Sequence, residues 1–220
     1  MREDFWHERW KNNEIAFHQN DINPLLQKYW PDFSLNTGAK IFVPLCGKTL
    51  DMLWLAQNDF YVLGIELSAI AIKGFFIENN LQYEKINKDR FEIWQADNIE
   101  IMCGDFFDLE TQHLNSVDAV YDRASLIAFP QDMRNRYVEH LERVLPRKAE
   151  TLLITLEYPQ HEMNGPPFSV VPDEVNELYK PWQQVVQLRR NEILDKVPRF
   201  RENGLTTLIE SVYRLSPLVS

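Results

Sequence analysis

Cysteine is scarce in this chain of 220 residues, which has only Cys46 and Cys103. Two cysteines are too few for a disulfide framework, and neither a C-x-x-C pair nor a histidine cluster is present to suggest zinc. We therefore expect two buried thiols and no metal site.

Long apolar runs and an excess of positive charge are also lacking. The N-terminal stretch MREDFWHERWKNNE has no apolar core of the signal-peptide type, and no later run approaches a membrane span, so we expect a cytoplasmic protein without membrane contact. The formal net charge of -10 creates a field that repels phosphate backbones, which argues against a nucleic-acid partner. Because repeats and heptads are missing too, we expect a monomer.

What the chain does have is ample core-forming material. Hydrophobic residues make up 45% and aromatic residues 12% of the sequence, enough for a well-buried domain. We expect a single domain over residues 1–220, in which residues 1–36 form an N-terminal helical cover. Trp6 and Trp10 would share one face of a helix over residues 4–12, either as core packing or as a lid over a ligand.

A glycine turn between two apolar runs is the most informative motif. Residues 40–43 read as a buried parallel strand, 49–57 as a helix and 60–65 as a second strand that ends at Glu66. Gly47 lies in the turn, where the absence of a Cβ lets backbone approach a ligand. Glu66 follows it by about 20 residues, the spacing of a carboxylate that accepts hydrogen bonds from ribose hydroxyls. Alternatively, Glu66 only caps the helix that starts at Ser68.

The glycine count of this turn separates three cofactor classes. A phosphate-binding P-loop needs a glycine where Phe42 stands, and a dinucleotide fold needs G-x-G-x-x-G, whereas residues 45–50 hold one glycine. A cofactor with ribose and adenine but without phosphate fits better, and S-adenosylmethionine is the common one. A nicotinamide-dependent oxidoreductase and a cofactor-binding module without turnover remain as alternatives.

Further apolar runs predict the rest of an α/β sheet. We expect a solvated loop at residues 83–89, and a final antiparallel hairpin formed by the last two strands. The expected strands lie over 91–96, 99–103, 116–121, 150–157, 182–188 and 205–215, and the expected helices over 24–30, 68–76, 132–145 and 173–179.

Candidate binding residues follow three of these strands. Asp105 and Phe106 come after the third parallel strand, where a carboxylate and an aromatic ring suit adenine, although a loop with a helix cap explains them equally well. Arg123 follows the fourth strand and could hold a cofactor carboxylate, steady an anionic nucleophile, or simply pair with Asp122. The proline-rich loop after the fifth strand, with Gly165-Pro166-Pro167-Phe168, would form a stiff wall of a substrate pocket.

The sequence resembles the thiopurine S-methyltransferase family over nearly its whole length. The matching stretches are WKNNEIAFHQ at residues 10–19, FVPLCGK at 42–48, GIELS at 64–68, YDR at 121–123 and GPPF at 165–168. The resemblance implies a Rossmann-like class I S-adenosylmethionine-dependent methyltransferase fold, with a seven-stranded, mostly parallel sheet and helices on both faces.

The same resemblance implies roles for particular residues. Cofactor contacts fall to Trp10, Leu45, Gly47, Glu66, Asp105, Phe106 and Arg123. Phe17 and Phe168 would contact the substrate, and Arg123 and Arg199 would assist catalysis electrostatically. The implied reaction is methyl transfer to the sulfur of thiopurines or other aromatic and heterocyclic thiols. Selenium or tellurium compounds, halides and small thiols are the alternative acceptors.

Overall fold

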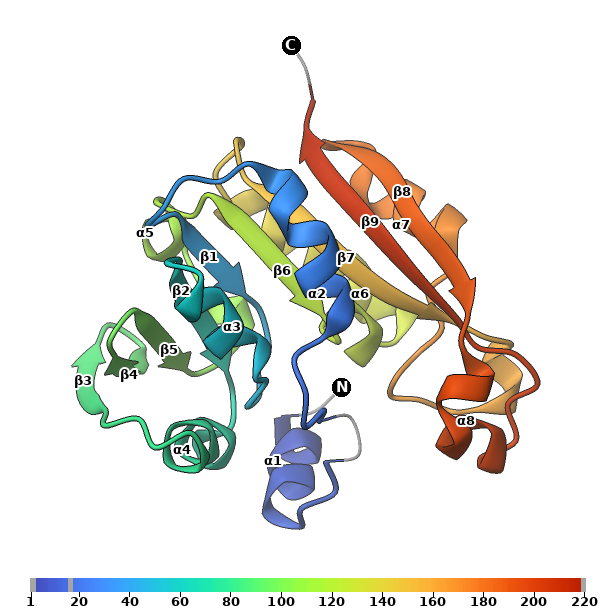
Figure 1. Ribbon diagram of the computed structural model, residues 1–220, viewed down its shortest axis with the longest axis horizontal. Coiled ribbons are helices and arrows are strands. Elements are labelled where there is room, and N and C mark those ends of the chain that lie inside the picture. Colours follow the sequence, from blue (N-terminus) through green and yellow to red (C-terminus); the bar gives the residue numbers. More distant parts are fainter. Residues whose placement is uncertain (1–2, 16–17, 219–220) are drawn as a thin grey trace. The chain divides into compact units, whose positions relative to one another are not determined.

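The computed structural model describes residues 3–15 and 18–218, and the chain folds as two compact units. The first unit comprises Met1–Tyr121 with Val144–Pro146, and the second comprises Asp122–Arg143 with Arg147–Ser220. Figure 1 follows the chain through both units by colour. The expectation of one domain over residues 1–220 stays a prediction.

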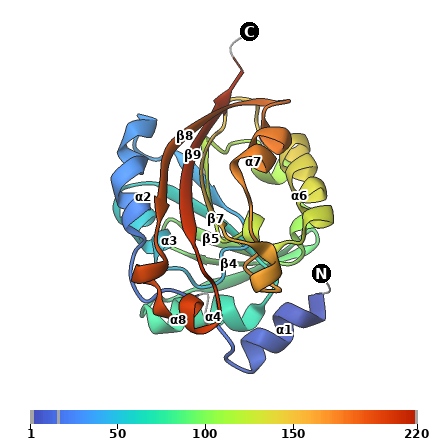
Figure 2. The same ribbon diagram turned by 90° about the vertical axis from the view of Figure 1, so that its right-hand side faces the viewer.

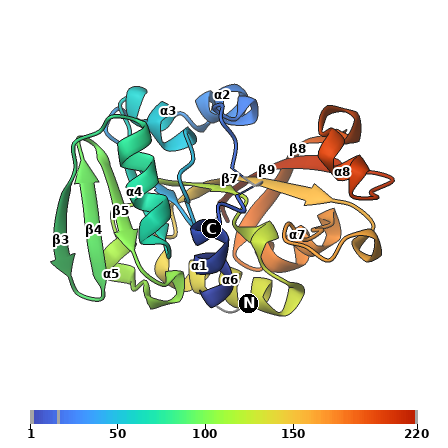
Figure 3. The same ribbon diagram turned by 90° about the horizontal axis from the view of Figure 1, so that it is seen from below.

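The first unit is an α/β sheet with its strands in the order β3-β4-β5-β2-β1-β6. Its strands are β1 (Lys40–Val43), β2 (Tyr61–Glu66), β3 (Glu84–Lys88), β4 (Phe91–Ala96), β5 (Ile99–Cys103) and β6 (Ala119–Arg123), which reaches into the second unit. Its helices are α1 (Glu3–Lys11), α2 (Pro24–Tyr29), α3 (Asp51–Gln57), α4 (Ala69–Glu78) and α5 (Thr111–Leu114), with the short 3-10 turns η1 (Trp30–Phe33) and η2 (Phe106–Asp108). Figure 3 shows α2 and α3 on the same side of these strands.

Strand β1 is the centre of this unit because it pairs in parallel with β2 on one side and with β6 on the other. The chain runs from β1 outward through β2, which pairs with β5, and then returns to β6. The strand order therefore reverses beside β1, and ligands of open parallel sheets bind at the carboxyl ends of the strands at such a point. Ile41 and Phe42 are fully buried, as a central parallel strand requires.

One strand of this unit contradicts the sequence analysis. Residues 83–89 were expected to be a loop, but β3 (Glu84–Lys88) pairs with β4 in an antiparallel ladder. All of its residues are exposed, so its sequence carries no alternation of apolar and polar positions. Lys85 Nζ lies 3.4 Å from the centroid of the Trp94 ring on the neighbouring strand. This cation–π contact stabilises the pairing of β3 with β4 without a buried apolar face.

The second unit pairs its strands antiparallel, in the order β7-β9-β8. Its strands are β7 (Glu150–Glu157), β8 (Gln183–Glu192) and β9 (Ile209–Pro217). Its helices are α6 (Gln131–Val144), α7 (Pro172–Tyr179) and α8 (Pro198–Glu202), with the 3-10 turns η3 (Leu126–Ala128), η4 (Gln160–Glu162) and η5 (Leu194–Lys196). In Figure 2, α6 and α7 lie on one side of β8 and β9. The hairpin expected near the C-terminus is confirmed.

The α/β class expected from the sequence is confirmed, but the number of strands is not. Over residues 3–15 and 18–218 the structure has nine strands and not the seven that the resemblance implied. The exposed edge strand β3 is the one that the apolar pattern did not predict, because an edge strand can be solvated on both faces.

Candidate functional site

The turn after β1 brings backbone N–H groups to the end of β2. Leu45 and Gly47 have positive φ angles of 45° and 55°, so the backbone turns sharply there. The N–H of Cys46 donates to the carbonyl of Ile65 at 2.9 Å, which ties the turn to β2. A glycine suits the second of the two left-handed positions because it has no Cβ to strain the backbone.

Glu66 ends β2 with its carboxylate turned into the glycine turn. Oε2 accepts from the N–H of Gly47 at 2.9 Å, and Oε1 accepts from the N–H of Ser68 at 2.8 Å. The residue is only 6% exposed, and this burial raises the pKa of its carboxyl to about 7, against the opposing effect of the backbone N–H groups of Ser68, Gly47 and Leu67. Glu66 therefore takes part in capping α4. It accepts from the N–H of Ser68, and the Ser68 side chain accepts from the N–H of Ala71 at the start of that helix.

The Glu66 carboxylate nevertheless retains capacity to bind a ligand. Each carboxylate oxygen accepts one backbone hydrogen bond and has further lone-pair sites. A diol could donate to those sites without displacing either backbone bond. The turn thus combines a buried acceptor with close backbone approach, which is the geometry expected of a ribose site.

Trp10 closes the other side of this turn. It lies near the end of α1, is 7% exposed, and its ring is so close to Gly47 that a Cβ there would be 3.2 Å from Trp10 Cζ2. The structure therefore brings together Trp10, Leu45, Gly47 and Glu66. Their role as cofactor contacts stays a prediction.

Asp105 and Phe106 follow β5 and lie in the same unit. Asp105 caps η2 by accepting from the N–H of Phe107 at 2.9 Å, so the capping alternative is confirmed as one of its roles. Phe106 is 2% exposed and packs edge-on against Phe107, with ring centroids 5.3 Å apart. The N–H of Gly104 donates to the Glu66 carbonyl at 3.0 Å, which connects this segment to the end of β2.

A second buried carboxylate near the turn was not predicted from the sequence. Asp51, the first residue of α3, is fully buried and accepts from the backbone N–H of Asn23 at 2.7 Å and from the Tyr121 hydroxyl at 2.9 Å. It thereby holds the N-terminal segment and β6 to the helix that follows the glycine turn. An acidic residue in the first turn of a helix is too common to have indicated this role.

In the second unit, Arg123 extends from the end of a strand that Asp122 holds in place. Asp122 is fully buried and accepts from the Tyr137 hydroxyl at 2.7 Å and the N–H of Leu126 at 3.4 Å. Burial raises the pKa of Asp122 to about 6 despite the hydrogen bonds from Tyr137, Leu126 and Ser125. Arg123 itself is half-buried.

The loop with Phe168 is braced by hydrogen bonds within the same unit. Phe168 donates its N–H to the Ile127 carbonyl at 2.7 Å, and Tyr158 donates its hydroxyl to the Pro167 carbonyl at 2.5 Å. Gln160 accepts from the N–H of Ser169 at 2.9 Å. These bonds hold the half-buried Phe168 on a braced backbone. Its place in the wall of a substrate pocket stays a prediction.

The other predicted site residues have different surroundings. Arg199 is an exposed residue of α8 whose guanidinium lies 4.9 Å from the centroid of the Phe200 ring. Phe17 lies outside the described residues. Cys46 is buried and Cys103 half-buried, and burial raises the pKa of both thiols, that of Cys103 to about 11.

Two classes of site are not found in the part of the chain that the structure describes. Over residues 3–15 and 18–218, no group of three or more His, Cys, Asp or Glu side chains could hold a metal ion. No helix in those ranges combines the length and apolar character needed to cross a membrane.

Known proteins resemble the chain over almost its entire length. The family described as Thiopurine S-methyltransferase (TPMT) matches residues 1–217. A protein of that name from Nitrosospira multiformis is 47% identical over 215 residues, which cover 98% of each chain. Another from Pseudomonas entomophila is 46% identical over 216 residues, which cover 98% of this chain and 100% of the relative.

Solved structures of more distant proteins share the fold. A SAM-dependent methyltransferase from Anabaena variabilis matches with a TM-score of 0.69 at 13% identity, covering 98% of this chain and 95% of that chain. A TehB-like SAM-dependent methyltransferase from Corynebacterium glutamicum matches with a TM-score of 0.57 at 15% identity, covering 98% of both chains. These neighbours confirm the Rossmann-like class I methyltransferase fold, and the family match confirms the resemblance that the sequence motifs indicated. The chain belongs to the thiopurine S-methyltransferase family.

Proposed function

We propose that this chain transfers the methyl group of S-adenosylmethionine to the sulfur of a small aromatic or heterocyclic thiol, the thiopurine class. Membership of the family and the methyltransferase fold support this activity. The observation that carries the proposal is the buried Glu66 carboxylate, held in the glycine turn by the N–H groups of Gly47 and Ser68.

The residues of the first unit fit this cofactor. Glu66 accepts from the ribose hydroxyls through the lone pairs that its two backbone bonds leave available. Trp10, Leu45 and Gly47 line the turn, where the backbone bends without a side chain at Gly47. Asp105 and Phe106 contact the adenine, through the carboxylate and the ring respectively. The bound cofactor supplies a methyl group on a positively charged sulfur, which needs no covalent enzyme intermediate.

The residues of the second unit serve the acceptor in this proposal. Arg123 lies at the end of β6, where its guanidinium favours a thiolate or holds a cofactor carboxylate. Arg199 supplies further positive charge, and Phe168, on its braced loop, forms an apolar wall. Phe17 remains a proposed substrate contact. The chain's own task is to align the acceptor and to exclude water.

We also propose that the enzyme is a cytoplasmic monomer that does not act on nucleic acid. The net charge of -10 supports the last point. A small-molecule acceptor agrees with the family to which the chain belongs.

An acceptor panel tests the reaction directly. The purified chain is mixed with S-adenosylmethionine and a thiopurine, an aryl thiol, an alkyl thiol, a halide or a selenium or tellurium compound, and release of S-adenosylhomocysteine is measured. We expect the fastest release with the thiopurine or the aryl thiol. Faster release with a halide or selenium compound would show that the acceptor is not an aromatic or heterocyclic thiol. Heat stabilisation by NAD but not by S-adenosylhomocysteine would show that S-adenosylmethionine is not the cofactor.

A further inference from the structure

Glu210 of β9 lies among the acceptor elements of the second unit, although nothing in its sequence surroundings singles it out. In the β7·β9 ladder it is directly opposite Leu156. The carbonyl of Leu156 accepts from the N–H of Val170 at 2.8 Å, two residues after Phe168. Phe168 in turn donates to Ile127, which follows Arg123 by four residues. Backbone contacts alone therefore connect Glu210 to the loop and to the strand end assigned to the acceptor.

The Glu210 carboxylate is held by a cross-strand ion pair and is not enclosed. Arg189 is opposite Val212 in the β8·β9 ladder, so Arg189 is diagonal to Glu210 on one face of the sheet. Arg189 Nη1 lies 3.6 Å from Glu210 Oε1, and both side chains are 20% exposed. The pair is thus accessible at its edge, whereas Asp122 is fully buried.

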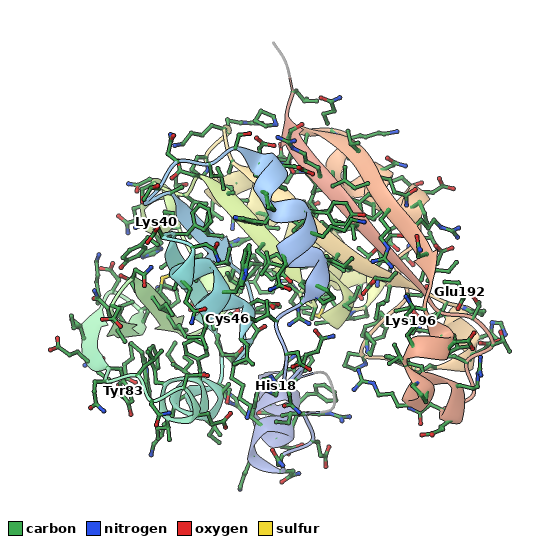
Figure 4. The ribbon with its side chains drawn as sticks, viewed as in Figure 1. His18, Lys40, Cys46, Tyr83, Glu192 and Lys196 are labelled. Carbon is green, nitrogen blue, oxygen red and sulfur yellow. The ribbon has the colours of Figure 1, made fainter. Side chains whose placement is uncertain are left out.

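Positive groups of three other elements act on this carboxylate. Burial has the largest effect and raises the pKa of Glu210 above its usual value, while the charges of Arg189 of β8, Arg123 of β6 and Lys196 of η5 each lower it. Figure 4 shows Lys196 near the end of β8, which Glu192 marks. A carboxyl whose pKa is raised by burial is a better proton acceptor than an exposed one.

The proposed reaction needs such a proton acceptor for some of its substrates. A thiol, or the N–H of a heterocyclic thione, must lose its proton when sulfur gains a methyl group. Acceptors that are already ionised do not need help, but acceptors with a high pKa do. General bases in enzymes contribute about 10²- to 10⁴-fold to such steps.

We infer that Glu210 is the general base that takes the proton of the acceptor, an inference that rests on the proposed function. The proton moves to the Glu210 carboxylate as the S–CH3 bond forms and the carbon–sulfur bond of the methyl donor breaks. The products are a thioether, S-adenosylhomocysteine and a neutral carboxyl group, which returns its proton to water. Arg123 stabilises the developing negative sulfur, and Arg189 keeps the carboxylate ionised beforehand.

The substitution Glu210→Gln separates a base from a structural residue. Two acceptors serve as probes: 4-nitrothiophenol, which is ionised at neutral pH, and benzyl mercaptan, which is mostly protonated. We expect kcat/KM for benzyl mercaptan to fall about 100-fold or more, and that for 4-nitrothiophenol to change by less than about threefold. Equal losses for both thiols, or no loss for either, would overturn the inference.

Glu157→Gln is the matched control. Glu157 ends β7, opposite Ile209 and one position away from Glu210 in the ladder, and its carboxylate pairs across β9 with Arg190 of β8 at 3.0 Å. Glu157→Gln makes the same chemical change as Glu210→Gln. It should leave the ratio of kcat/KM for benzyl mercaptan to kcat/KM for 4-nitrothiophenol unaltered. A shift of this ratio equal to that of Glu210→Gln would overturn a specific role for Glu210.

A second variant keeps the inference testable if Glu210→Gln does not fold. Arg189→Gln removes the positive charge that pairs with Glu210 at 3.6 Å, so the pKa of Glu210 must rise. The acid limb of the kcat/KM profile for benzyl mercaptan should then move to higher pH, because the base is active only when ionised. An acid limb that stays in place would refute the role of Glu210. If the unsubstituted chain releases no S-adenosylhomocysteine with a thiopurine or with either thiol, the proposed function itself fails, and the general base with it; release with a thiopurine but with neither thiol would overturn the general base alone.

Discussion

Glu66 in the first unit and Asp122 in the second are both buried carboxylates with raised pKa values, yet they differ in their partners. Among the described residues, the Glu66 carboxylate accepts from backbone N–H groups, those of Gly47 in the turn and of Ser68 before α4, and it remains 6% exposed. Asp122 is fully buried and accepts from the Tyr137 hydroxyl as well as from Leu126. The first carboxylate can still meet a ligand, whereas the second is fully buried.

This difference shows that a raised pKa does not by itself identify a binding residue. Burial raises the pKa to about 7 for Glu66 and to about 6 for Asp122, so the two shifts are of the same kind. What separates them is the remaining exposed edge of Glu66 and the positive φ of Gly47 beside it. Asp122 instead fixes the strand end from which Arg123 extends.

Glu66→Ala should have the largest effect, because it removes the acceptor from the ribose hydroxyls. Two charge-assisted hydrogen bonds are lost, so binding of S-adenosylhomocysteine should weaken by at least about 3 kcal/mol, or roughly 100-fold. Isothermal titration calorimetry measures the affinity. Glu84→Ala on the exposed strand β3 is the control, and its affinity should equal that of the unsubstituted chain. Similar affinities for both variants would remove Glu66 from the cofactor site.

Tyr137→Phe should reduce stability without affecting the cofactor. It takes away the 2.7 Å hydrogen bond to a fully buried carboxylate, which should lower the free energy of unfolding by about 2 kcal/mol. The corresponding fall in Tm is about 4–8 °C for a chain of this size. Tyr61→Phe, which removes a 3.0 Å bond to the half-buried Glu100, should cost less. If Tyr137→Phe instead weakened S-adenosylhomocysteine binding as much as Glu66→Ala, the contrast between the two carboxylates would disappear.

Lowering the pH should weaken cofactor binding through Glu66. Burial raises the pKa of this carboxyl to about 7, and only the ionised form accepts both ribose hydrogen bonds. Between pH 8 and pH 6 the affinity for S-adenosylhomocysteine should therefore fall about tenfold, equivalent to about 1.4 kcal/mol. Titrations at several pH values measure this fall. In Glu66→Gln the pH dependence should vanish, and its persistence would assign the titration to another group.

Gly47→Ala should have the smallest effect. The new methyl group would meet a left-handed φ and would lie 3.2 Å from Trp10 Cζ2. Gly38→Ala is the control, because its φ is also positive and nothing lies within 4 Å of the new Cβ. Urea unfolding should show a loss for Gly47→Ala that exceeds the loss for Gly38→Ala by about 1 kcal/mol. Equal losses would mean that Trp10 does not restrict the turn.

Much of the first unit could be predicted from the sequence because its signals are local. The apolar strands β1 and β2, the glycine turn and Glu66 follow one another within a single βαβ unit. Spacing alone therefore predicted that Gly47 and Glu66 follow neighbouring parallel strands, and the structure adds that the Gly47 N–H donates to the Glu66 carboxylate. The strand β3 escaped prediction because all its residues are exposed.

By itself, the sequence determined the α/β class, the family and the carboxylate at the end of the second strand. Only the tertiary structure decided which distant side chains meet: Asp51 with Asn23 and Tyr121, Asp122 with Tyr137, and Glu210 with Arg189. The physical reason is that strand periodicity specifies the face on which a side chain lies but not its neighbour across the sheet. That neighbour depends on strand order and register, which become defined only when the chain is folded.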